Sequence, residues 1–171
     1  MHEKQYEYMY FFNNLQQTVI EHYLKPHDKQ SIVVMENLGS NLRIAYLNTP
    51  VQHSDEPGLV WLPGLNSTKT STKVSALEEW AAQTNRSMLR FDYSGHGASD
   101  GKFTDGTIGQ WLEESLAILR GVASGPQILV GSSMRGWFVL LILRAIVNEE
   151  QKVRNLCPIE GAVLIAPAWG A

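Results

Sequence analysis

The sequence predicts an α/β fold, in which a mostly parallel β-sheet carries helices on both faces. After residue 58, short apolar runs alternate with helical stretches, as in successive β-α-β units. The apolar runs are too continuous to leave one face of a sheet in water, which is typical of buried parallel strands. Two further strands precede residue 58 with no helix between them, so we expect the sheet to begin with an antiparallel pair.

Residues 1–30 are predicted to form an N-terminal helical extension. Its apolar residues recur at spacings of three and four, which places them on one face of a helix. These residues are Tyr8, Phe12, Leu15, Val19 and Tyr23. Pro26 is expected to end the helix. We expect the apolar face to pack on the following domain, with an oligomer contact as the alternative.

Residues 31–171 are predicted to form an incomplete α/β domain. The expected strands are Ser31–Met35, Leu42–Leu47, Gly58–Leu62, Ser87–Asp92, Gln127–Val130 and Ile159–Ala166. The expected helices are Val74–Thr84, Thr107–Val122 and Met134–Val147. Thr107 is a candidate N-cap, because its side-chain oxygen can accept a hydrogen bond from a first-turn amide.

Composition and charge exclude several functional classes. The chain has 171 residues, is 44% hydrophobic and 18% charged, and has a net charge of −3, so it predicts a globular protein without the basic surface that binds nucleic acid. The longest apolar run, Trp137 to Leu143, is far shorter than the ~18 residues of a membrane span. Cys157 is the single cysteine, and the first residues lack the pattern of a secretory signal. We therefore expect a cytoplasmic protein without a membrane span.

A strand–turn–helix junction around Ser133 is the most informative part of the sequence. The strand from Gln127 runs into Gly131-Ser132-Ser133, and an apolar helix follows at once. A serine on such a sharp turn has a strained backbone and an exposed Oγ. The N–H of Met134, at the start of the helix, can stabilise an oxyanion. We predict Ser133 to be a nucleophile; the alternative is a serine that only caps the helix.

The turn also predicts small residues on either side of the serine. Glycine is expected two residues before and two residues after Ser133, because a Cβ atom would collide with the neighbouring strand or helix. Gly131 meets the first requirement, but Arg135 occupies the second position and Gly136 follows one residue late. A cation near a helix N-terminus costs ~0.3–1 kcal/mol before any steric conflict. If Arg135 is a steric defect, Arg135→Gly should raise the melting temperature.

Two loops complete the candidate site. In Trp61-Leu-Pro-Gly-Leu-Asn-Ser, the N–H of Leu65 is the candidate second oxyanion donor, and Gly64 would permit close approach. The alternative is an ordinary Pro-Gly turn.

The second loop is Arg90-Phe-Asp-Tyr-Ser-Gly-His-Gly-Ala-Ser-Asp-Gly. Asp92, Ser94 and Asp100 are expected to hydrogen-bond amides of this loop, as short polar residues do in turns. His96 precedes the nucleophile, against the Ser–Asp–His order of this type of site, so we expect it to be structural.

Four ordered blocks in this chain resemble a known family. They are Leu62-Pro-Gly, Thr68-Lys-Thr, the run from Leu89 to Gly101, and the run from Gly125 to Met134. Over about residues 40–170, the chain is similar to the branch of the α/β-hydrolase superfamily that includes the mitochondrial palmitoyl-protein thioesterase and acyl-glucuronide esterase, with their bacterial relatives. The resemblance implies a serine carboxylesterase or thioesterase with no metal or organic cofactor and a small ester or thioester substrate. It assigns Ser133 as nucleophile and Leu65 and Met134 as the oxyanion hole.

The sequence departs from this family after the nucleophile. Family members carry a catalytic Asp and then a His, whereas the printed residues after Ser133 include neither, and their only acids are Glu149, Glu150 and Glu160. We therefore expect an α/β-hydrolase domain that lacks the C-terminal strands and helices and is inactive or weakly active. The alternatives are a catalytically dead remnant or interaction protein, a serine peptidase of the proline-iminopeptidase type, and an acyltransferase.

The same departure predicts a surface for self-association. The last strand, Ile159–Ala166, is expected to be an open apolar edge that can pair with another chain. The N-terminal helix is the second candidate contact.

Overall fold

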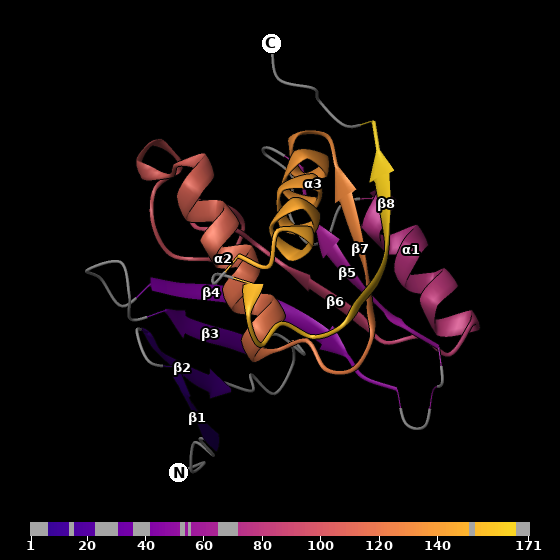
Figure 1. Ribbon diagram of the computed structural model, residues 1–171, viewed down its shortest axis with the longest axis horizontal. Helices are drawn as coiled ribbons and strands as arrows, with labels where there is room; N and C mark the ends of the chain where they lie inside the picture. Colours follow the sequence, from indigo (N-terminus) through magenta and orange to yellow (C-terminus); the bar gives the residue numbers. More distant parts are fainter. Residues whose placement is uncertain are drawn as a thin grey trace.

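A single mixed β-sheet organises the chain. The computed structural model describes residues 7–13, 16–22, 31–35, 42–51, 54, 56–64, 72–150 and 153–166, the first three ranges as backbone. The strands are β1 (Glu7–Asn13), β2 (Gln16–His22), β3 (Ser31–Met35), β4 (Leu42–Thr49), β5 (Gly58–Leu62), β6 (Met88–Phe91), β7 (Gln127–Ser132) and β8 (Ile159–Ile165). Their order across the sheet is β1-β2-β3-β4-β6-β5-β7-β8 (Figure 1).

The sheet has an antiparallel half and a parallel half. Neighbouring strands from β1 to β4 are antiparallel, as is the pair formed by β4 and β6. The pairs β5–β6, β5–β7 and β7–β8 are parallel. The predicted fold class is thereby confirmed, including its antiparallel start. Among the described strands, β8 is the last in the order and pairs with β7 alone.

Helices cover both faces of the parallel half. They are α1 (Thr72–Gln83), α2 (Ile108–Gly121) and α3 (Met134–Val147), and Figure 1 shows α1 on the opposite side of the sheet from α2 and α3. The side chains of the fully buried β5 alternate between the two layers, because successive residues of a strand point to opposite faces. Val60 and Leu62 pack in the core with α2 and α3, whereas Leu59 and Trp61 pack in the core with α1.

Local sequence signals set the helix boundaries. The Thr107 hydroxyl accepts a hydrogen bond from the N–H of Gln110 at 3.1 Å, so the predicted N-cap of α2 is confirmed. The helix α3 occupies Met134–Val147 as predicted, and the other predicted boundaries from residue 31 onward differ by at most two residues.

The described parts of the N-terminal segment, residues 7–13 and 16–22, are strands, so the predicted helix is wrong there; Leu15, Tyr23 and Pro26 lie outside the described residues. β1 and β2 form an antiparallel hairpin, and β2 pairs with β3 through Thr18 with Met35 and Val19 with Val34. The spacing of three and four picked out a subset of a longer run of strand-forming residues, since β1 contains Tyr-Met-Tyr-Phe-Phe and β2 contains Thr-Val-Ile. Pairing with β3 provides backbone hydrogen bonds that local periodicity does not reveal. The predicted boundary at residue 30 thus falls between two strands of one sheet.

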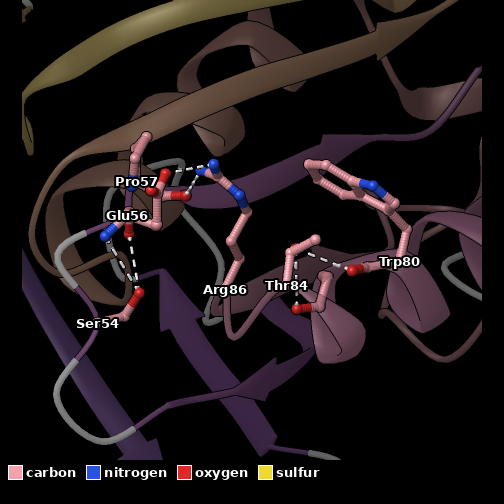
Figure 2. Close-up of polar contacts among 7 residues, drawn as sticks. Ser54, Glu56, Pro57, Trp80, Thr84 and Arg86 are labelled. Carbon is pink, nitrogen blue, oxygen red and sulfur yellow. Dashed lines mark hydrogen bonds and ion pairs between the residues drawn. The ribbon is translucent and has the colours of Figure 1, made fainter.

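Arg86 fastens the amino end of β5 to α1. Its Nη1 donates to the Pro57 carbonyl at 2.8 Å, and its Nη2 forms an ion pair with Glu56 (Figure 2). The guanidinium also lies 5.5 Å from the ring centroid of Trp80 on α1, within cation–π range. These contacts fix the start of β5. Because β5 and β7 are parallel neighbours, the carboxyl end of β5 lies beside the carboxyl end of β7.

Candidate functional site

Ser133 lies at the turn between β7 and α3, which we call the elbow (residues 131–136). Its backbone has φ 55° and ψ −129°, in a region that residues other than glycine rarely adopt and that costs about 1–3 kcal/mol. Ser133 is exposed, whereas the preceding Ser132 is buried. Strain and exposure therefore coincide at one residue of the turn.

Two backbone hydrogen bonds hold the strained residue. The N–H of Ser133 donates to the carbonyl of Ile165 on β8 at 2.9 Å, and its own carbonyl accepts from the N–H of Gly136 at 2.9 Å. Strained residues persist only where their surroundings fix them. The strand β8 and the first turn of α3 provide those surroundings here.

The position two residues before Ser133 has no room for a side chain. A Cβ atom at Gly131 would lie 2.7 Å from the Arg135 carbonyl oxygen, 2.7 Å from Val139 Cγ2 and 2.9 Å from Gly136 Cα. Two of these three atoms belong to the backbone of the elbow, so they cannot rotate away. The collision expected from the sequence is therefore present at Gly131.

The structure gives Arg135 an environment that the sequence did not predict. Its side chain is 0% exposed, and its guanidinium carbon lies 4.2 Å from the ring centroid of Tyr93 and 4.5 Å from those of Trp111 and Phe138. None of its three side-chain nitrogens has a hydrogen-bond partner among the described residues. Burial lowers the pKa of Arg135 from its ordinary value. The Arg135 side chain is therefore a buried cation packed among aromatic rings.

A buried carboxylate accompanies this cation. Glu114 on α2 is 0% exposed, and its Oε2 accepts from the N–H of Ser94 at 2.9 Å while its Oε1 accepts from Gln110 Nε2 at 3.2 Å. Burial raises the pKa of Glu114, opposed first by its hydrogen bonds and then by the positive charge of Arg135. Glu114 and Arg135 therefore attract each other electrostatically within the same core, and each favours the charged form of the other. An acid inside the apolar run of α2 was the sequence signal that could have indicated this arrangement.

The loop after β6 packs beside this core. The Asp92 carboxylate accepts from the N–H of Ala98 at 3.0 Å, and the Asp100 carboxylate accepts from Arg43 Nε at 3.0 Å and from its N–H at 3.3 Å. The predicted contact with a loop amide is confirmed for Asp92, whereas the amide that Asp100 binds belongs to Arg43 on β4, outside the loop. The prediction for Ser94 is wrong in its donor, because the Ser94 hydroxyl accepts from the side chain of Gln110 at 3.1 Å.

His96 lies in an aromatic cluster within this loop. Its Nδ1 is 3.0 Å from the Ser94 carbonyl, and its ring centroid is 5.3 Å from that of Phe103 and 5.4 Å from that of Trp111. The side chain is 7% exposed. These contacts agree with a structural histidine.

The other predicted site residues lie around the elbow or outside the described residues. Met134 is half-buried at the first position of α3, and Gly64 and Gly136 are buried. Leu62 of β5 pairs with Gly131 of β7, so the segment that begins at Pro63 leaves the sheet beside the elbow. Leu65, the predicted second oxyanion donor, lies outside the described residues.

The described residues contain no group of three or more His, Cys, Asp or Glu side chains that could hold a metal ion. They also contain no helix long and apolar enough to span a membrane. A cavity of about 240 Å³ lies at the amino ends of the parallel strands, whereas the elbow lies at the carboxyl end of β7. The lining of this cavity includes Gly58 and Gln127, the first residues of β5 and β7.

Comparisons with known proteins place this geometry among α/β hydrolases. No family model matches the chain. Over 106 residues it is 43% identical to the mitochondrial palmitoyl-protein thioesterase ABHD10 of Mus musculus, covering 62% of this chain and 35% of that protein. The solved mouse α/β hydrolase domain-containing protein 10 superimposes with a TM-score of 0.67 at 34% identity, covering 82% of this chain and 50% of that chain. A hydrolase from Agrobacterium vitis S4 superimposes with a TM-score of 0.66 at 33% identity, covering 98% of this chain and 54% of that chain.

These relatives confirm the resemblance predicted from the four sequence blocks. The chain spans about a third of the length of the curated relatives that it matches and about half the length of these two solved chains.

Proposed function

We propose, on the premise that this chain has the α/β-hydrolase fold, that it is the nucleophile-bearing part of a serine hydrolase acting on acyl esters or thioesters. One observation carries the proposal: Ser133 is exposed and strained at the carboxyl end of a buried parallel strand, directly before a helix. Nucleophilic serines of this fold occupy such a turn. The curated relatives are named as palmitoyl-protein thioesterases, and this similarity favours a thioester or ester substrate.

The proposed reaction has two acyl-transfer steps. The Oγ of Ser133 attacks the carbonyl carbon and forms an acyl-enzyme as the alcohol or thiol leaves. Water then attacks the acyl-enzyme, releases the acid and restores the serine. In both steps the N–H of Met134 donates to the carbonyl oxygen as its negative charge develops, and the N–H of Leu65 is the proposed second donor.

Activation of the serine determines the rate that we expect. In this fold a histidine, oriented by a carboxylate, takes the proton from the nucleophile. The printed residues after Ser133 contain neither Asp nor His. We therefore assign no base within residues 1–171 and propose that this chain reacts slowly, since an unassisted serine is a poor nucleophile near neutral pH.

Covalent labelling tests the assignment of Ser133. The chain is incubated with a fluorophosphonate probe, and the modified residue is located by peptide mass spectrometry. We expect slow labelling of Ser133 that disappears in Ser133→Ala and persists in the adjacent control, Ser132→Ala. Lack of modification at Ser133 in folded protein would favour the alternative of a non-enzymatic interaction protein. A panel of p-nitrophenyl esters, acyl thioesters and amino-acid anilides then separates esterase, thioesterase and peptidase activities.

We propose a cytoplasmic protein from the sequence, whereas the curated relatives are named as mitochondrial. Fractionation of cells that express the natural gene separates the two locations. Self-association through β8 is the proposed protein contact.

A further inference from the structure

Arg135 joins the first turn of α3 to two other elements. Tyr93 follows β6, Trp111 lies on α2 and Phe138 lies one turn further along α3, and all three rings surround the same guanidinium. We call this group of four residues the Arg135 clamp. Because its members come from three parts of the chain, loss of the cation would weaken the contacts of the first turn of α3 with both neighbours and would leave the direct contact between the Tyr93 and Phe138 rings.

We propose that Arg135 is a positioning residue, which holds the first turn of α3 and thereby the strained conformation of Ser133. The backbone supports this connection directly. The Arg135 carbonyl oxygen packs against Gly131, and the next residue, Gly136, donates its N–H to the Ser133 carbonyl. A displacement of Arg135 therefore changes both flanks of the nucleophile turn.

The charge of Arg135, and not only its volume, is inferred to matter. None of its three side-chain nitrogens meets hydrogen-bond geometry with a described residue, so compensation for the buried cation comes from the ring faces and from the polar Tyr93 side chain, which favours the charged form of Arg135. The carboxylate of Glu114 adds electrostatic attraction from α2. A neutral side chain of similar length would keep much of the packing but lose both interactions.

From the sequence, Arg135→Gly is expected to raise the melting temperature only if Arg135 is a steric defect, and to give no gain if the elbow has adapted to it. In the structure, that substitution empties the space among three rings and leaves Glu114 without its nearby cation. We now expect the melting temperature to fall.

The first experiment compares Arg135→Met and Arg135→Lys with the control Arg144→Met, which removes an exposed arginine from the same helix. The Ser133 and Gly136 amides donate to the carbonyls of Ile165 and Ser133, so their hydrogen exchange reports local opening within residues 133–137, and thermal melts report global stability. We expect Arg135→Met to speed exchange at these amides by about tenfold or more. Arg135→Lys should recover part of the protection, because it restores a cation, and Arg144→Met should leave these amides unchanged.

A second experiment separates charge from volume by chemical rescue. Arg135→Gly is melted with millimolar methylguanidinium, a cation of the same chemistry as the lost side-chain end in the Arg135 clamp. A parallel melt contains urea, which is neutral, at the same concentration. We expect methylguanidinium, but not urea, to raise the melting temperature of Arg135→Gly. This increase should exceed any change that methylguanidinium causes in the wild type. If Arg135→Gly does not fold, Phe138→Leu removes one ring face and is expected to speed exchange at residues 133–137 to a smaller extent.

The effect on Ser133 itself is read from the rate of fluorophosphonate labelling, and this readout rests on the proposed function. We expect Arg135→Met to label about tenfold more slowly at a temperature where it is fully folded. Failure of the wild type to label would refute the proposed function but leave the exchange and rescue tests of the clamp intact. Equal exchange at residues 133–137 in wild type and Arg135→Met, or a higher melting temperature in Arg135→Gly, would overturn the positioning role.

Discussion

Gly131→Ala tests whether the elbow depends on the absence of a side chain. The added Cβ would lie 2.7 Å from the Arg135 carbonyl oxygen, 2.7 Å from Val139 Cγ2 and 2.9 Å from Gly136 Cα. All three distances are shorter than ordinary contacts, and only the Val139 methyl can move without shifting the backbone. Overpacking of a well-packed site typically costs about 1–3 kcal/mol, and we expect the upper half of that range, about 2–3 kcal/mol.

Thermal unfolding converts this estimate into a measurement. For a domain of this size, each kcal/mol lowers the melting temperature by about 2–4 °C, so Gly131→Ala should melt roughly 4–12 °C below the wild type. Gly109→Ala is the matched control, because a Cβ there meets only Thr107 Oγ1 at 4.0 Å. In α2 this control should gain up to about 1 kcal/mol from helix propensity. Equal melting temperatures for Gly131→Ala and wild type would refute the packing argument.

Two further predictions concern strain and buried charge. Ser133→Gly should raise the free energy of unfolding by about 1–2 kcal/mol in urea titrations, because relief of backbone strain outweighs the entropy cost of glycine; no gain would argue against strain at φ 55°. Glu114→Gln tests the buried carboxyl, whose folded pKa is raised above its ordinary value of 4.5 by burial, against its hydrogen bonds and the charge of Arg135. A carboxyl whose folded pKa is raised contributes stability below its ordinary pKa of 4.5, and this stability is lost as the pH rises through the folded pKa. Wild type should therefore lose stability relative to Glu114→Gln as the pH is raised above 4.5. A stability difference that stays constant with pH would contradict this sign.

Local signals in the sequence were sufficient for most of the parallel half of the sheet. Buried strands read as continuous apolar runs, Thr107 caps α2 through a contact within one turn, and the elbow is built from consecutive residues. Each of these features involves residues close together in the chain. For that reason the alternation of strands and helices, the start of α3 and the strained serine could be predicted before any tertiary contact was known.

Pairing between distant segments decided what the sequence left open or misassigned. The residues of β1 and β2 have apolar spacings that suit a helix and residue types that suit strands, and pairing of β2 with β3 resolves the conflict in favour of a hairpin. In the order β4-β6-β5-β7, the neighbours β4 and β6, and likewise β5 and β7, are not consecutive in the sequence, so this order follows from hydrogen bonding between distant segments.

Arg135 shows the same division most clearly. The sequence by itself determined that a large cation stands where the turn favours glycine, and it left open whether this arginine is a steric defect or an adapted part of the elbow. Only the tertiary structure brings Tyr93, Trp111 and Phe138 around that guanidinium and places Glu114 in the same core. The energy of a buried charge depends on the groups that surround it in space, and these groups come from elements that the sequence could predict but could not position.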